Sequence, residues 1–221
     1  MLQVREAPSP APGAGEVRID VSAAGVNFAD TMARAGLYED APPIPCVVGY
    51  EVAGTVAEHG TDGDTSLLPV GSRVMAGTRF GGYAEQVVVP VADVIALPEP
   101  LSFEQGAAIP VNYATAWAGL IGYGSLQPGE RVLIHAAAGG VGIAATQIAK
   151  HTGAEVWGTA SPGKHDAIRE QGVDHPLDYT TSGWDEDLPG MDLIMDAIGG
   201  ESFRACTLES GEMAVAGATW W

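Results

Sequence analysis

Short apolar runs separated by glycine and proline fill the first hundred residues. In 16–26, Val17, Ile19 and Val21 fall at every second position, which predicts a strand with one buried face. Residues 27–36 have the spacing of a short helix. The strand pattern returns over 47–60, 71–76 and 81–97. Strands this short and this closely spaced predict a small β-barrel-type domain.

Near residue 100 the pattern changes to strands that alternate with helices. Helical spacing covers 101–124, with Ser102 as the expected N-cap. Strands are predicted over 129–136, 154–161, 175–179, 191–200 and 211–218, and helices over 142–153 and 163–172. This alternation predicts a doubly wound parallel sheet. The fold class is therefore α/β, with one domain over 1–105 and a second over 106–221.

Charge is the unusual feature of the composition. The chain has 221 residues, 46% of them hydrophobic, which is ordinary for a globular protein. Asp and Glu number 28 against 10 Lys and Arg, for a formal net charge of −18. Such a surface repels nucleic acid and anionic membranes, so we expect neither as a partner. It either keeps the protein soluble or adapts it to high salt, as in halophilic proteins.

The cysteines and the N-terminus indicate a cytoplasmic protein. Cys46 and Cys206 are the only cysteines and have no metal-ligand spacing, so we expect two buried thiols. The first ten residues lack the apolar core of a secretory leader. Residues 132–149 are uncharged and reach the minimum length of a membrane span, but glycines interrupt them. We therefore expect no span.

The stretch "HAAAGGVGIAA" (135–145) lies between a predicted strand and a predicted helix, as a dinucleotide-binding fingerprint requires. Gly139 would let the backbone approach a pyrophosphate, and Gly142 would let the helix pack closely on the strand. The helix N-terminus would offer N–H groups and a positive dipole end to the phosphates. The alternative is a tight turn without a ligand. We assign the diphosphate to Ala138, Gly139, Gly140, Val141 and Gly142.

The end of the second strand of this domain favours NADP(H) over NAD(H). An NAD site expects Asp or Glu about 20 residues after the glycines, on the ribose hydroxyls. The sequence there is "GTASPGKH" (158–165), without a carboxylate. Ser161 and Lys164 provide the hydroxyl and the cation that a 2′-phosphate needs, and His165 could assist. The alternative is a helix N-cap followed by a surface lysine.

Five segments of the chain carry a resemblance to a known family: "AAGVNFADTMARAGLY" (23–38), "GYEVAGTV" (49–56), "VNYATAWAGL" (111–120), "GERVLIHAAAGGVGIAATQIAK" (129–150) and "GTASPGKHDAIREQGVDHPLDY" (158–179). Together they resemble the medium-chain dehydrogenase/reductase superfamily, in its zinc-free quinone oxidoreductase branch. They are most similar to the vesicle amine transport protein homologues, and also to polyketide synthase enoyl reductase domains. The resemblance implies a GroES-like domain over 1–105 and an NADP-binding Rossmann domain over 106–221.

The resemblance also bears on zinc. Zinc-bearing relatives have Cys where this chain has Val26–Asn27, and His where it has Tyr50. Neither replacement is a zinc ligand. The resemblance therefore implies chemistry without a metal.

Single residues acquire roles from the same resemblance. It implies a cleft between the two domains, with the nicotinamide beside Asn27, Thr115 and the strand end at Gly217. Tyr179 matches a tyrosine near the adenosine phosphate, and Tyr38 matches a tyrosine proposed as proton donor in some enoyl reductase domains. The alternatives are a helix N-cap for Asn27 and a surface loop position for Tyr38.

Two further residues allow both a functional and a structural interpretation. His135 ends the first strand of the second domain, and we favour a buried, hydrogen-bonded imidazole over a cofactor contact. Asp30 is expected to favour the first turn of its helix through the helix dipole.

The length of the chain differs from that of the family it resembles. Relatives continue past this point with a sixth strand and commonly dimerise through that edge. The chain therefore looks truncated, either as a fragment or as a naturally short form. The resemblance allows a homodimer.

Two functions follow from these observations. The first is an NADPH-dependent reductase that transfers hydride to a quinone or an α,β-unsaturated carbonyl, with water or Tyr38 delivering the proton. The second is an NADPH-binding protein with little turnover that acts through lipid or protein contacts.

Overall fold

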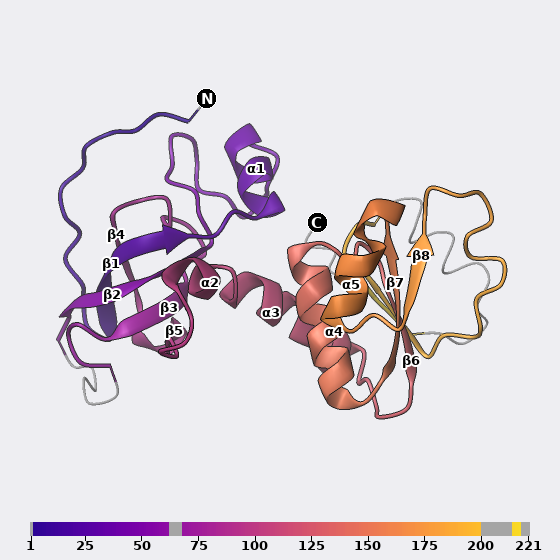
Figure 1. The fold of residues 1–221 in the computed structure, drawn as a ribbon. Coiled ribbons are helices and arrows are strands. Elements are labelled where there is room, and N and C mark those ends of the chain that lie inside the picture. The colour runs from indigo at the N-terminus through magenta and orange to yellow at the C-terminus, as the bar shows by residue number, and fades with distance from the viewer. Residues whose placement is uncertain (1, 62–67, 200–213, 218–221) are drawn as a thin grey trace. The chain divides into compact units, whose positions relative to one another are not determined.

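The computed structural model describes residues 2–61, 68–199 and 214–217 (Figure 1). These residues form two compact units, of which the first ends at Val111 and the second begins at Asn112. Helix α3 (Pro110–Trp117) carries the chain from one unit into the other.

Unit 1 is built on an antiparallel sheet. Its strands are β1 (Glu16–Ala24), β2 (Glu51–His59), β3 (Arg73–Gly77), β4 (Gln86–Pro90) and β5 (Val94–Ala96). In the described part of the chain they are ordered β4-β1-β2-β3-β5. The register between β1 and β2 shifts at two places, and such bulges bend and twist a sheet. The predicted β-barrel-type, GroES-like domain is confirmed.

Alternating apolar residues give unit 1 its core. Val17 and Ile19 are fully buried, and they pack against Val52, Val56 and Val74 from the neighbouring strands. The opposite face of β2 and β3 packs on the short helix α2 (Phe103–Ala107). The expected strand over 81–97 is interrupted by a 3₁₀ turn at Val91–Asp93.

The helical region predicted over 101–124 is divided into separate helices in the structure. Ser102 caps α2 as expected: its hydroxyl accepts from the N–H of Gln105, and the Gln105 side chain accepts from the N–H of Ser102. Pro110 then starts the separate helix α3, because proline lacks an N–H donor and disfavours helix at the residue before it. Residues 118–123 continue as a π-helical turn.

Unit 2 contains a parallel sheet. Its strands are β6 (Arg131–Ile134), β7 (Glu155–Ala160), β8 (His175–Asp178), β9 (Leu193–Asp196) and β10 (Ala214–Gly217). The helices are α4 (Gly140–Thr152) and α5 (His165–Gln171), with a 3₁₀ turn at Pro162–Lys164. In the described residues the order is β10-β9-β6-β7-β8, and every pair is parallel. The predicted Rossmann-type parallel sheet is confirmed.

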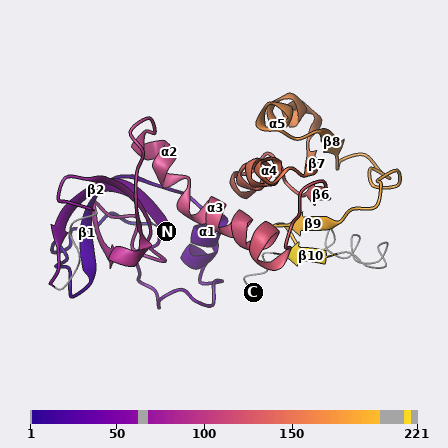
Figure 2. The same ribbon diagram turned by 90° about the horizontal axis from the view of Figure 1, so that it is seen from below.

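Both faces of the unit 2 sheet are covered. Ile134 and Val156 point to the face on which α4 and α5 pack, and Figure 2 shows these helices on the same side of the strands. Leu133 and Trp157 point to the other face, where they meet Trp184 from the loop after β8. Strands buried on both faces explain the continuous apolar runs in the sequence.

Two smaller expectations have different outcomes. Cys46 is a free thiol that is half-buried, not buried as expected, and Cys206 lies outside the described residues. Among the described residues, no helix combines the length and apolar character that crossing a membrane would require.

Ile134 tests the packing of the unit 2 core, because it is 1% exposed. Ile134→Ala should lower the free energy of unfolding by about 2–5 kcal/mol, through lost burial and the cavity it leaves. Urea denaturation followed by tryptophan fluorescence measures this change. Ile198, which is 57% exposed, is the matched control, and Ile198→Ala should change stability little. Equal losses for the two variants would contradict the core assigned here.

Candidate functional site

The turn between β6 and α4 presents backbone to solvent. Ala136 has φ +52°, and the N–H of Gly139 donates to its carbonyl oxygen over 2.8 Å. Gly139 and Gly140 are exposed, while Ala138 and Val141 are half-buried. The first turn of a helix leaves N–H groups without helical acceptors. This turn can therefore offer backbone donors to an anionic ligand.

A close approach of backbone requires glycine at position 142 of this turn. A Cβ on Gly142 would lie 2.3 Å from the carbonyl oxygen of Ala136, which is too short for a side chain. A Cβ on Gly140 would lie 2.6 Å from Oδ1 of Asn112, so the Asn112 side chain would have to move. Sequence reasoning missed Asn112. Its signal in the sequence is its place on α3, three residues before the half-buried Thr115 and so on the same helix face.

The turn lies at a switch point of the sheet. Strand β6 has β7 on one side and β9 on the other, so the chain builds the sheet outward in both directions from β6. In open α/β sheets, ligands bind outside the carboxyl ends of the strands at such a point.

Other predicted residues stand at the same edge of the sheet. Ser161 follows β7, Tyr179 follows β8, and Gly217 is the last residue of β10. Because all these strands are parallel, their carboxyl ends share one edge with the turn after β6. The topology thus gathers these positions although they are far apart in the sequence.

The residues after β7 leave one cation accessible. Lys164 is exposed and makes no ion pair with the described residues, and Ser161 is half-buried. Nε2 of His165 lies 3.1 Å from the carbonyl oxygen of Ala160, so one ring nitrogen is engaged by the backbone.

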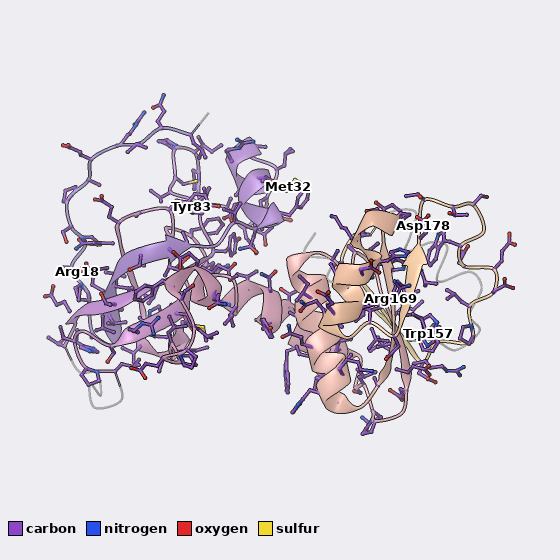
Figure 3. All side chains as sticks on the ribbon, viewed as in Figure 1. Arg18, Met32, Tyr83, Trp157, Arg169 and Asp178 are labelled. Atoms are coloured by element: carbon purple, nitrogen blue, oxygen red, sulfur yellow. The ribbon has the colours of Figure 1, made fainter. Side chains whose placement is uncertain are left out.

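A carboxylate that sequence reasoning did not single out ends the next strand. Asp178, labelled in Figure 3, accepts from the N–H and the hydroxyl of Thr180 at 2.9 and 2.6 Å, and from the hydroxyl of Thr181 at 3.0 Å. These bonds, the Thr180 hydroxyl first, lower the pKa of Asp178, with a contribution from nearby His165. The carboxylate of Asp178 thus accepts hydrogen bonds from residues of its own loop, and the next residue in the chain is the exposed Tyr179.

His135 is buried beneath the glycine turn. Its Nδ1 lies 3.4 Å from the hydroxyl of Thr159, and its ring packs edge-on to Trp184 at a centroid distance of 5.8 Å. Burial lowers the pKa of His135, although the charge of Asp196 opposes this shift. Asp196 is itself buried and accepts from two N–H groups of the turn that follows it.

In unit 1, Glu51 holds Asn27. Nδ2 of Asn27 donates to Oε1 of Glu51 over 2.8 Å, and the N–H of Val111 donates to Oε2 over 2.8 Å. Glu51 is 1% exposed. Burial raises the pKa of the Glu51 carboxyl, and these two hydrogen bonds act against that shift. Glu51 therefore fixes the orientation of the Asn27 side chain.

Asp30 does more than favour the first turn of helix α1 (Phe28–Ala35). It is buried, and its carboxylate accepts from the N–H of Asn27 at 2.8 Å, the N–H of Gly49 at 2.9 Å and the hydroxyl of Tyr83 at 3.2 Å. Burial and the Asp30 charge raise the pKa of Tyr83, which is labelled in Figure 3, to about 12. The expectation of a dipole effect alone missed this network, which also makes Asn27 the N-cap residue of α1.

Tyr38 lies just after α1, against a pocket of about 520 Å³. Its other lining residues are Ala33, Gly36, Leu37, Glu39, Ala41, Pro42, Pro43 and Ile44. Tyr38 packs edge-on to Tyr50, which in turn packs on Phe80. In the described part of the chain, no group of three or more His, Cys, Asp or Glu side chains is arranged to hold a metal ion.

Comparisons with known proteins agree with both units. Residues 13–99 match the model of the alcohol dehydrogenase GroES-like domain. The human synaptic vesicle membrane protein VAT-1 homolog is 45% identical over 205 residues, which is 90% of this chain. The crystal structure of CurK enoyl reductase is 32% identical, with a TM-score of 0.86, over 96% of this chain and 68% of that one. Mycobacterial Rv1454c, solved in complex with NADPH, is 33% identical, with a TM-score of 0.82, over 91% and 64%.

The extent of these matches differs between relatives. The match covers 52% of the human VAT-1 homolog, so the chain spans about half the length of the curated relatives it matches.

The pKa of His135 predicts how stability depends on pH. The depressed pKa of the folded state means that below about pH 6.5 the unfolded chain binds a proton that the folded chain excludes. The stabilisation is complete above that pH and is lost as the pH falls, by at most about 1.4 kcal/mol per pH unit. Urea denaturation from about pH 7 to about pH 5.5 measures this slope.

His135→Asn should flatten the slope in this window. His151→Asn, at an exposed position near the end of α4, should keep it. The same slope in wild type and His135→Asn would refute the assignment.

Proposed function

This chain belongs to the medium-chain dehydrogenase/reductase superfamily, in its quinone oxidoreductase branch, and on that premise we propose that it is an NADPH-dependent reductase. Its substrate would be a quinone or an α,β-unsaturated carbonyl, reduced without zinc. The observation that carries the proposal is the exposed turn at Gly139–Gly140, which opens α4 at the switch point of the parallel sheet.

The residues at the carboxyl edge of the sheet suit a dinucleotide. The close approaches at Gly140 and Gly142 leave the turn without side chains, which is what a pyrophosphate against the backbone needs. Ala138 and Val141 would flank the diphosphate. Thr115 and Gly217 would lie along the nicotinamide half.

The adenosine end favours NADPH over NADH. Ser161 and the exposed Lys164 would hold the 2′-phosphate, with Tyr179 beside it. The chain has only two lysines, and the other one, Lys150, is engaged: its Nζ lies 2.8 Å from Oδ2 of Asp174. Because no carboxylate follows β7 directly, the ribose contact expected of an NAD site has no residue there.

For this reaction the protein needs mainly to position the substrate and to donate a proton. A bound nicotinamide supplies the hydride. Asn27, held by Glu51, would lie beside the nicotinamide, and Tyr38 would supply a hydroxyl at the pocket. Val26–Asn27 and Tyr50 stand where zinc-bearing relatives have their Cys and His ligands, so a donor hydroxyl would replace the metal as the group that meets developing negative charge.

A second function is carried by the relatives' names. Curated relatives that are 45% identical are called synaptic vesicle membrane protein VAT-1 homolog. An NADPH-binding protein with little turnover, acting through lipid or protein contacts, is therefore the alternative. A homodimer and a cytoplasmic location belong to either proposal.

A turnover assay separates the two functions. With NADPH, the purified chain should oxidise the cofactor in the presence of naphthoquinone or methyl vinyl ketone, measured by the loss of nicotinamide absorbance. The same assay without an acceptor is the control. Binding of NADPH, measured by fluorescence, together with no oxidation by any acceptor, would favour the binding role over the reductase.

Lys164 decides the cofactor preference. Lys164→Glu should raise KM for NADPH by about 10- to 100-fold, as expected for loss of a charge-assisted hydrogen bond, and leave KM for NADH nearly unchanged. Arg169→Glu makes the same charge change on exposed α5 and should alter neither value much. Equal effects of Lys164→Glu on both cofactors would rule out a 2′-phosphate contact.

A further inference from the structure

Tyr38 and Tyr50 form a pair in unit 1 that neither the family pattern nor the sequence motifs explain. Their ring centroids are 5.9 Å apart, with the planes at 78°. A side-chain hydrogen bond to Tyr38 is one of the causes that raise the pKa of Tyr50, after burial. This bond favours the protonated form of Tyr50, which makes Tyr50 the donor and the oxygen of Tyr38 the acceptor. A phenolic hydroxyl has one hydrogen to donate, so that of Tyr38 is directed elsewhere.

The pocket gives the two tyrosines different positions. Tyr38 is among the residues that line it, whereas Tyr50 is not. Leu37, Pro42 and Ile44 add apolar surface to the lining and Glu39 adds a carboxylate, while Tyr38 is the lining residue that carries a hydroxyl. Tyr50 therefore reaches a ligand in this pocket only through Tyr38.

Tyr50 is held firmly on its other side. Its carbonyl oxygen accepts from the N–H of Thr78 at 2.8 Å, and its ring packs on Phe80 at a centroid distance of 4.9 Å. The carbonyl oxygen of the preceding Gly49 accepts from the hydroxyl of Thr78 at 2.7 Å. The position of the Tyr50 hydroxyl is thus fixed by two segments of unit 1.

The surroundings keep Tyr50 protonated. Burial, the bond to Tyr38 and the charges of Asp40 and Asp30 raise the pKa of Tyr50 well above its usual value. Tyr50 therefore stays a hydrogen-bond donor at any pH at which the protein would work.

We propose that Tyr50 is a positioning residue for proton delivery by Tyr38 to an α,β-unsaturated carbonyl in this pocket, an inference that rests on the proposed function. After the acceptor has taken a hydride at its β-carbon, it is an enolate. The O–H bond of Tyr38 breaks, a C–H bond forms at the α-carbon, and the electron pair stays on the Tyr38 oxygen. The Tyr50 hydroxyl stabilises this phenolate, and a proton from water restores Tyr38.

A double-mutant cycle tests this relation. Tyr38→Phe should lower kcat for methyl vinyl ketone by about 100-fold or more, as for the loss of a general acid. Tyr50→Phe keeps the ring and should lower kcat by about 2- to 10-fold, as for one lost hydrogen bond, with KM for NADPH unchanged. The double variant should match Tyr38→Phe within about twofold, because Tyr50 acts only through Tyr38.

One further readout, with a control variant, separates this role from a structural one. The solvent deuterium isotope effect on kcat should increase in Tyr50→Phe, because proton transfer becomes slower relative to the other steps. Tyr123→Phe removes a hydroxyl from a residue that is 81% exposed on the π-helical turn, and it should leave both kcat and the isotope effect unchanged.

The outcomes distinguish this proposal from the proposed function. Suppose that the wild-type protein is active. If the decreases in kcat of the two single variants multiply in the double variant, or if Tyr38→Phe keeps full kcat, the role proposed for Tyr50 is wrong and the proposed reductase function is unaffected. If the wild-type protein fails to oxidise NADPH with every acceptor tested, both the relay and the proposed function are overturned.

Discussion

Helix α4 begins closer to strand β6 than any side chain at position 142 allows. A Cβ on Gly142 would meet the Ala136 carbonyl at 2.3 Å, so the turn depends on glycine. This approach brings the helix N-terminus directly above the strand end, and Gly139 and Gly140 remain exposed there. The dinucleotide site proposed for unit 2 depends on this contact, because a helix displaced by a side chain would no longer present its N–H groups at the switch point.

Unit 1 depends on two carboxylates that are almost completely buried. Burying a carboxylate is costly unless hydrogen bonds replace its water. Glu51 meets this cost with the Asn27 amide and the N–H of Val111, and Asp30 with the N–H groups of Asn27 and Gly49. The same bonds fix the Asn27 side chain, the start of α1 and the first turn of α3. The polar network thus positions a candidate active-site residue while it stabilises the fold.

The order of elements followed from the sequence because apolar periodicity and glycine placement act locally. Strands and helices lie close to where alternation and helical spacing predicted them, and Ser102 caps α2 as its side-chain chemistry predicts. The helix expected over 101–124 was wrong as one element, since Pro110 divides it. Most of the candidate cofactor positions could be found because they lie at or just after a strand end, and parallel strands end at one edge; Thr115 lies on α3 instead.

The sequence by itself determined the α/β fold class, the glycine turn and the place of Ser161 and Lys164 just after β7, because each is a matter of neighbours along the chain. Only the tertiary structure decided that Asn112 lies over Gly140, that Asp30 and Glu51 share Asn27, and that Tyr50 stands behind Tyr38. These contacts join residues from different elements. Their physical reason is that buried polar groups must find partners, and the partners are whichever groups the packing brings within hydrogen-bond distance.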